Sequence, residues 1–195
     1  MEIESEIKNL RSKQQVEKLI RWVGTNAKRF AQLMNLFLHG DQDISRRSAW
    51  VIGHCCERNP ELAKPWLKTM IKKMQEPNMH NAIQRNVMRI LQYVEIPSSL
   101  KGKVTNICFD FISDTKTAIA PQAFAMTVLA NIAKKESDLL KELRVLVHQM
   151  LPYGTPAFRA RAKKIFKNLG LSEKNSVINK NEEDTLLHEW LMKKD

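Results

Sequence analysis

The sequence predicts an all-α fold: a right-handed α-α superhelix of about four helix pairs, preceded by an N-terminal capping helix. Three observations lead to this prediction. Similar units recur at intervals of 38, 39 and 37 residues when aligned on Arg47, Arg85, Phe124 and Arg161. Small and large apolar residues occupy fixed offsets from these anchors, and a second apolar stripe lies between successive anchors. A fixed period of this size with two amphipathic helices per unit is typical of an α-solenoid.

The fixed offsets place one face of each anchor helix in the core. Small residues lie one position after the anchor: Ser48, Asn86, Ala125 and Ala162. Large, mostly apolar residues lie five and eight positions after it: Ile52, Ile90, Leu129 and Phe166, then Cys55, Tyr93, Ile132 and Leu169. Offsets of one, five and eight fall on one side of a helix with 3.6 residues per turn. We expect the small residues to allow a neighbouring helix to approach closely.

The run Arg46-x-x-Ala49-x-x-Ile52-Gly53 resembles the inner helix of a HEAT repeat. The resemblance covers roughly residues 26–170, and in the third unit Phe124 stands in place of the arginine. It implies a HEAT- or armadillo-like solenoid in which the anchor helices are the inner helices that line a concave face. Such repeats host many unrelated functions, so the resemblance implies the fold and leaves the activity open.

Local signals place the elements along the chain. An amphipathic helix is expected over residues 3–23, with a capping box of Ser12 and Gln15 in its middle. The outer helices are predicted over about 27–39, from 60 to 75, from 97 onward and from 137 to 151, with Asn59 and Ser137 as caps. The inner helices are predicted after the turn at 40–43, over 81–94, from 121 to 134 and from 156 to 169. Residues 1–170 are predicted to form one solenoid domain, and 171–195 a polar linker with a short C-terminal helix.

The composition limits the classes of partner, location and metal site that we expect. The net charge of +11 favours an anionic partner, although the basic excess is spread evenly along the chain. No run of 18 apolar residues occurs and the N-terminus is acidic, so neither a membrane span nor a signal peptide is expected, and a cytoplasmic location is predicted. Three cysteines without Cys-x-x-Cys spacing argue against a zinc site. We expect no metal and no cofactor.

The candidate binding site lies on the exposed side of the inner helices. Neutral hydrogen-bonding residues stand seven positions after the anchors: His54, Gln92, Asn131 and Asn168. Three positions after the anchors stand Trp50, Met88, Thr127 and Lys164, and Arg89 lies near the anchor arginines. A groove built from these side chains would suit an extended peptide or a nucleic-acid strand. The alternative is that the polar residues bond one repeat to the next and that Arg47 and Arg85 pair with acids such as Asp43.

Two further motifs carry competing interpretations. Trp50 is either a binding anchor or a core residue, whereas Trp66 is predicted to lie in the core. His54-Cys55-Cys56 invites a nucleophile hypothesis, but adjacent residues on a helix point about 100° apart and Cys55 occupies a core column. No catalytic residue is predicted.

The favoured function is a non-enzymatic adaptor that binds a protein or peptide segment. Its site would be formed by Arg47, Trp50, His54, Arg85, Arg89, Gln92, Asn131, Arg161, Lys164 and Asn168. The alternative is nucleic-acid binding, because the chain is also similar in kind to HEAT-like alkylation-repair DNA glycosylases, which hold duplex DNA in a basic groove. Those enzymes need a catalytic Asp, and here Asn26, His54, Met70 and Lys194 stand four positions after the tryptophans. Binding without cleavage is therefore the form of this alternative that we retain. The sequence leaves the oligomeric state open.

Overall fold

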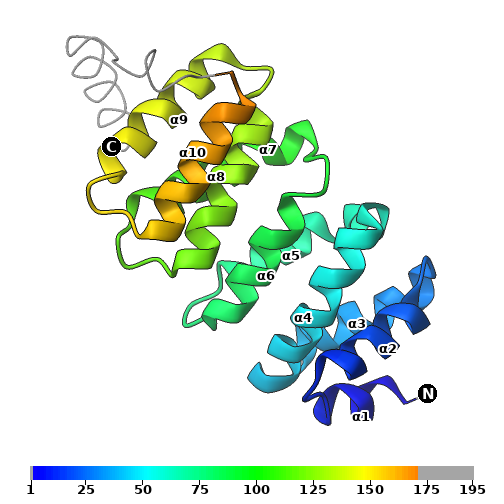
Figure 1. Ribbon diagram of the computed structural model, residues 1–195. Coiled ribbons are helices and arrows are strands. Elements are labelled where there is room, and N and C mark those ends of the chain that lie inside the picture. Colours follow the sequence, from blue (N-terminus) through cyan, green and yellow to red (C-terminus); the bar gives the residue numbers. More distant parts are fainter. Residues whose placement is uncertain (1, 171–195) are drawn as a thin grey trace. The chain divides into compact units, whose positions relative to one another are not determined.

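The computed structural model describes residues 2–170, and these residues are helical with connecting turns and no strand (Figure 1). Contacts divide the chain into two compact units, with the division between Leu100 and Lys101. We call the part before this division unit 1 and the part after it unit 2, and each is described by itself. The predicted all-α architecture of packed helix pairs is confirmed. The predicted C-terminal linker and helix lie outside the described residues.

Unit 1 is built around α4. Its helices are α1 (Ile3–Lys8), α2 (Lys13–Val23), α3 (Ala27–His39), α4 (Gln42–Arg58), the 3-10 helix η1 (Pro60–Trp66), α5 (Leu67–Met74) and α6 (Asn81–Leu91). Helix α4 packs against α3 on one side and α6 on another, and α1, α2 and η1 also contact it. The chain is not helical between α1 and α2, and α2 begins with the predicted capping box of Ser12 and Gln15. Because α4 has neighbours on several sides, most of its surface is buried.

Unit 2 is built around α8. It contains most of α7 (Ser98–Ser113), together with α8 (Ile119–Ala133), α9 (Ser137–Met150) and α10 (Pro156–Asn168). Helix α8 packs against both α9 and α10, and ten of its residues, from Pro121 to Ala133, are buried. Thr155 caps α10 by accepting a hydrogen bond from the Phe158 N–H at 3.2 Å, as predicted from the Thr-Pro pair.

A side chain at the start of each inner helix binds a carbonyl at the end of its outer helix. The donors lie one or two positions before the anchors. The four bonds are Ser45 Oγ to Phe37 O at 2.8 Å, Gln84 Nε2 to Met74 O at 3.5 Å, Gln122 Nε2 to Ile112 O at 3.1 Å and Arg159 Nε to Leu151 O at 3.1 Å. The last carbonyls of a helix have no partner within that helix, so these bonds satisfy groups that the turn would otherwise leave open. They also fix the angle between the paired helices.

Two of the predicted capping bonds are absent, although the helices begin at Pro60 and Ser137. The Asn59 side chain does not cap the following helix, because its amide donates to Gly24 O at 3.2 Å. That segment is a 3-10 helix, and Pro65 inside it lacks the N–H that a continuing α-helix would require. Ser137 is the first helical residue of α9, and Glu136 occupies the cap position without a side-chain capping bond.

The predicted core columns are confirmed except at Tyr93, which is exposed, and at Phe166 and Leu169, which are half-buried. The small residues Ser48, Asn86, Ala125 and Ala162 are all buried. Tyr93 is exposed, although the eighth offset predicted it to be in the core. Helix α6 ends at Leu91, so Tyr93 lies in the turn beyond it and no longer follows the helical spacing. Val94 is buried one position later.

Candidate functional site

The arginines of α4 and α6 lie on helices whose starts are fixed by side-chain caps. Asp41 Oδ1 accepts a hydrogen bond from the Ile44 N–H at 2.8 Å and begins α4. Asp43, Arg46, Arg47 and Trp50 then follow at spacings of three and four, which place them on one face of the helix. His80 Nδ1 caps α6 by accepting from the Ala82 N–H at 3.0 Å. The spacing of three residues likewise brings Ala82 and Arg85 to one face of α6.

These two faces enclose a hollow of about 270 Å³ within unit 1. Its lining has four guanidinium groups, one indole and two apolar side chains: Arg11, Arg46, Arg47, Arg85, Trp50, Leu10 and Ala82. We call this hollow the arginine pocket. Three of the predicted site residues (Arg47, Trp50 and Arg85) are therefore brought together.

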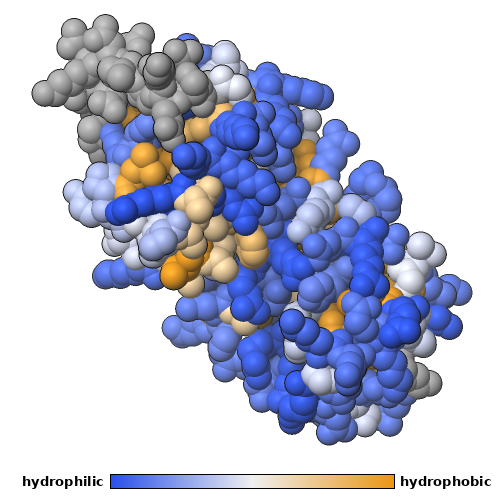
Figure 2. Space-filling model, in the orientation of Figure 1, coloured by the Kyte–Doolittle hydropathy of each residue, from blue (hydrophilic) through white to orange (hydrophobic). Residues whose placement is uncertain are grey.

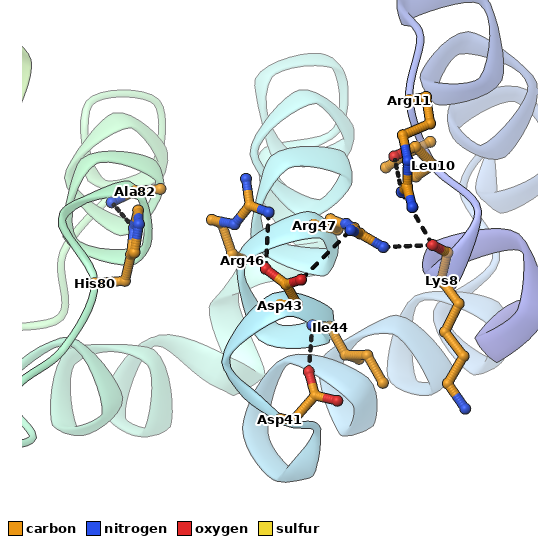
Figure 3. Close-up of polar contacts among 10 residues, drawn as sticks. All are labelled: Lys8, Leu10, Arg11, Asp41, Asp43, Ile44, Arg46, Arg47, His80 and Ala82. Atoms are coloured by element: carbon orange, nitrogen blue, oxygen red, sulfur yellow. Dashed lines mark hydrogen bonds and ion pairs between the residues drawn. The ribbon is translucent and has the colours of Figure 1, made fainter.

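Two of the pocket arginines share a backbone carbonyl. Arg11 Nη1 donates to Lys8 O at 3.0 Å, and Arg47 Nη1 donates to the same oxygen. Figure 3 shows both guanidinium groups turned toward this carbonyl, while the Lys8 ammonium points away from it. That ammonium pairs with Glu4 at 2.7 Å. The carbonyl therefore holds two positive groups close together without neutralising either of them.

Asp43 supplies the negative charge beside the pocket. Its carboxylate lies 2.8 Å from Arg46 Nη2 and 3.5 Å from Arg47 Nη2 (Figure 3). The hydrogen bond from Arg46 and the charge of that arginine, followed by the charges of Arg47 and Arg11, hold the pKa of Asp43 below its usual value. Asp43 is therefore ionised at neutral pH. The predicted alternative, in which Arg47 pairs with Asp43, is what the structure shows for this arginine.

Arg85 is the exception in the pocket. It is exposed, and no hydrogen bond or ion pair to it is found within residues 2–170. Trp50, opposite it on α4, is half-buried and so is neither a full core residue nor a free surface one. Trp66, which the sequence placed in the core, is also only half-buried, because the 3-10 segment ends there. An unpaired guanidinium beside a partly exposed indole is the part of the pocket best able to contact a ligand.

His54 and Arg89 form a second cluster that ties α4 to α6. The Arg89 guanidinium nitrogens lie 3.4 and 3.3 Å from the His54 ring nitrogens, and Arg89 also pairs with Glu57. The Tyr93 hydroxyl donates a hydrogen bond to Glu57 Oε1 at 3.1 Å. Burial, then the charge of Arg89, lowers the pKa of His54 below its usual value. These two predicted site residues thus bond one repeat to the next, as the alternative interpretation held.

The remaining predicted positions of the inner helices have varied surroundings. Gln92 donates to Arg89 O at 3.2 Å from the turn after α6. Met88, expected on the exposed side, is fully buried because α6 packs against both α4 and α5 and so buries a wider face. In unit 2, Asn131, Lys164 and Asn168 are exposed, in keeping with their predicted orientation.

Arg161, the anchor of α10, has its own partners in unit 2. Its Nη1 donates to Thr127 Oγ1 at 3.0 Å, and its guanidinium lies 5.9 Å from the centre of the Phe124 ring. Phe124 and Thr127 both belong to α8. The substitution of phenylalanine for arginine at the third anchor therefore provides an aromatic surface for the fourth.

Sequence reasoning missed Arg11 and Arg46 as pocket residues. Arg46 adjoins Arg47 in the HEAT-like run. The repeats were aligned on Arg47, so only Arg47 was predicted to lie in the site. Arg11 precedes the Ser12 capping box, in a stretch that the sequence assigned to a capping helix. No local pattern indicates that this stretch packs against α4.

The cysteines do not form a nucleophilic site. Cys55, Cys56 and Cys108 are buried and free. Burial raises the pKa of Cys55 to about 12 and raises the pKa values of the other two thiols as well. All three are protonated at neutral pH, and a protonated thiol is a poor nucleophile. Among the described residues, no three His, Cys, Asp or Glu side chains converge as metal ligands would.

Comparisons with known proteins identify the repeat. A family model described as a HEAT repeat domain matches residues 3–169. No curated protein and no solved structure matches the chain significantly. Within the described residues, none of the helices is both long enough and apolar enough to span a membrane.

Proposed function

The chain belongs to the HEAT repeat family, and on this premise we propose that it is a non-enzymatic adaptor that binds a segment of a partner protein. HEAT repeats form helical scaffolds, and such scaffolds commonly mediate protein interactions. The partner segment would lie along α4 and α6 of unit 1 and enter the arginine pocket. In unit 2, the exposed Asn131, Lys164 and Asn168 are proposed as further positions that contact a partner.

The observation that carries this proposal is that Arg85 and Trp50 line the same pocket. Arginine and tryptophan are the residue types most often found to dominate binding energies at protein interfaces. Arg85 makes no hydrogen bond or ion pair within the described chain, so binding would not require an existing contact to be broken. Trp50 offers a rigid apolar surface at little cost in side-chain entropy.

The test is capture of a partner by three forms of the full chain. Wild-type protein, Arg85→Glu and Arg21→Glu are immobilised and exposed to nuclease-treated lysate of the source cells. Arg21 is exposed on α2 and is not part of the pocket lining, so it controls for net charge. We expect one or more proteins to be retained by wild type and by Arg21→Glu, and to be lost at least about tenfold with Arg85→Glu. Equal retention by all three forms, with unchanged circular dichroism, would contradict this use of the pocket.

Nucleic-acid binding is the second candidate, and the density of guanidinium groups in the pocket favours it. Arginines and an aromatic side chain are also what a nucleic-acid surface uses, and the chain carries a net charge of +11. This alternative predicts that affinity for duplex DNA falls steeply as salt rises. A gel shift at low salt that shows no retarded band would eliminate it. A salt-dependent band that Arg85→Glu weakens would favour it over the adaptor.

A further inference from the structure

The arginine pocket carries more positive charge than its own residues neutralise. Four guanidinium groups line it, and Asp43 is the single carboxylate within residues 2–170 that pairs with any of them. Arg47 is the most enclosed of the paired arginines, with its side chain only 17% exposed. Because Arg47 is partly buried, its repulsion by the neighbouring cations is screened less than it would be in open water. An anion placed in the pocket would relieve this repulsion.

The arrangement of the donors indicates what kind of anion would fit. Arg11 and Arg47 approach Lys8 O from one side, Arg46 reaches Asp43 on α4, and Arg85 faces them from α6 (Figure 3 shows the first three). A carboxylate brings two oxygens in one plane and a single negative charge, and Asp43 already places one such group beside Arg46 and Arg47. A phosphoryl group has three oxygens directed outward and a charge of about −1.5 to −2 at pH 7, so it can bond to several arginines at once.

We propose that the arginine pocket binds a phosphoryl group carried by a side chain of the partner segment. This inference rests on the proposed adaptor function and names the chemistry of its ligand. The phosphoryl oxygens accept hydrogen bonds from Arg85 and from the free N–H groups of Arg46 and Arg47. Trp50, Leu10 and Ala82 form the apolar wall against which the carbon atoms of the phosphorylated side chain pack. Recognition of phosphorylated motifs by arginine clusters follows this physical pattern.

The pocket has room for this ligand. Its volume of about 270 Å³ accommodates a phosphoryl group together with the end of the side chain that carries it. The face of unit 1 visible in the space-filling view is largely hydrophilic (Figure 2). The partner segment would therefore approach through water and bury mainly the phosphorylated side chain.

The experiment compares small anions on the full chain. Phenyl phosphate, diphenyl phosphate and phenylacetate are titrated while the arginine Nε–H and tryptophan indole N–H signals are followed by NMR. We expect phenyl phosphate to shift the signals of Arg47, Arg85 and Trp50 and to bind at least about tenfold more tightly than phenylacetate. Arg85→Gln and Arg47→Gln should each weaken phenyl phosphate binding about tenfold, while Arg21→Gln on α2 leaves it unchanged.

Each other outcome overturns the inference in a recognisable way. Equal affinity for phenylacetate would make the pocket a carboxylate site, and the adaptor function would stand. Equal affinity for diphenyl phosphate, a phosphodiester, would favour nucleic acid. If Arg21→Gln weakened phenyl phosphate binding as much as the pocket variants do, the binding would depend on net charge and not on the pocket. If none of the three anions binds, the phosphoryl inference fails, whereas the capture experiment with Arg85→Glu decides the adaptor function separately.

Discussion

Arg47 in unit 1 and Arg161 in unit 2 hold the same position in their repeats, yet their surroundings differ. Arg47 meets Arg11 on one carbonyl and shares Asp43 with Arg46. Arg161 meets the neutral Thr127 hydroxyl and the Phe124 ring. The repeat fixes the position of each arginine on its helix. The elements packed against that helix decide which groups the guanidinium contacts. In unit 1 the anchor arginine therefore belongs to a cluster of four guanidinium groups, whereas in unit 2 it meets uncharged groups.

The surfaces of the two units differ in the same sense. Figure 2 shows patches of apolar side chains among hydrophilic ones on unit 2, while unit 1 presents a mainly hydrophilic face in that view. Ile119, at the start of α8, is 50% exposed. Helix α8 is apolar on most of its surface, whereas α4 and α6 place arginines on their exposed faces.

The largest expected effect comes from the matched turn glycines, Gly40 in unit 1 and Gly154 in unit 2. A Cβ at Gly40 would lie 2.5 Å from both Leu36 O and Ile44 Cγ2, and one at Gly154 would lie 2.6 Å from Phe158 Cδ1. We expect each alanine variant to lose about 1–3 kcal/mol of local stability. Gly40→Ala should lose more, because a backbone carbonyl cannot rotate away. Hydrogen exchange of the flanking helices measures both, and a greater loss for Gly154→Ala would contradict this reasoning.

The second-largest effect distinguishes Arg161 in unit 2 from Arg85 in unit 1. Arg161→Gln should lower the free energy of unfolding by about 0.5–1.5 kcal/mol, because it removes a hydrogen bond and a cation–π contact. Arg85→Gln should leave stability unchanged or raise it slightly at low salt, because it removes one of four neighbouring cations. Thermal unfolding at low and high salt tests both expectations. A loss for Arg85→Gln as large as that for Arg161→Gln would show that the pocket arginine has a structural role.

The third effect is a pH dependence located in unit 1. The folded pKa of His54 is lowered, first by burial and then by Arg89, so below about pH 6.5 the unfolded chain binds more protons than the folded one. The contribution of His54 to stability is complete above that pH and is lost as the pH falls through the lowered pKa. Removal of this histidine should therefore make the free energy of unfolding depend less on pH in this range. Chemical denaturation of wild type and His54→Gln between pH 7.5 and 5 measures the difference, and parallel curves would refute it.

The smallest effect concerns the small-residue column. Unit 1 has Ser48 and Asn86 at this offset, whereas unit 2 has Ala125 and Ala162, and all four are buried. The Ser48 hydroxyl has no hydrogen-bond partner within the described chain. Ser48→Ala should therefore keep or raise the free energy of unfolding, by up to about 1 kcal/mol. A clear loss in urea denaturation would mean that the hydroxyl has a partner, such as a buried water.

The sequence by itself determined the helix pairs, their period and most of the buried columns. The Ser12–Gln15 capping box, the Thr155 cap and the burial of Ser48 and Ala125 follow from local spacing. These features are predictable because a helix repeats every 3.6 residues and because caps involve neighbours only three residues away.

Only the tertiary structure decided which arginines meet. Arg11 and Arg47 are 36 positions apart in the sequence, and both reach Lys8 O because the chain between α1 and α2 packs on α4. Met88 is buried because α6 has two neighbours, and Tyr93 is exposed because α6 ends before it. Long side chains can reach several partners across a helix interface. The partner that each one finds therefore depends on how the helices pack, which local spacing does not encode.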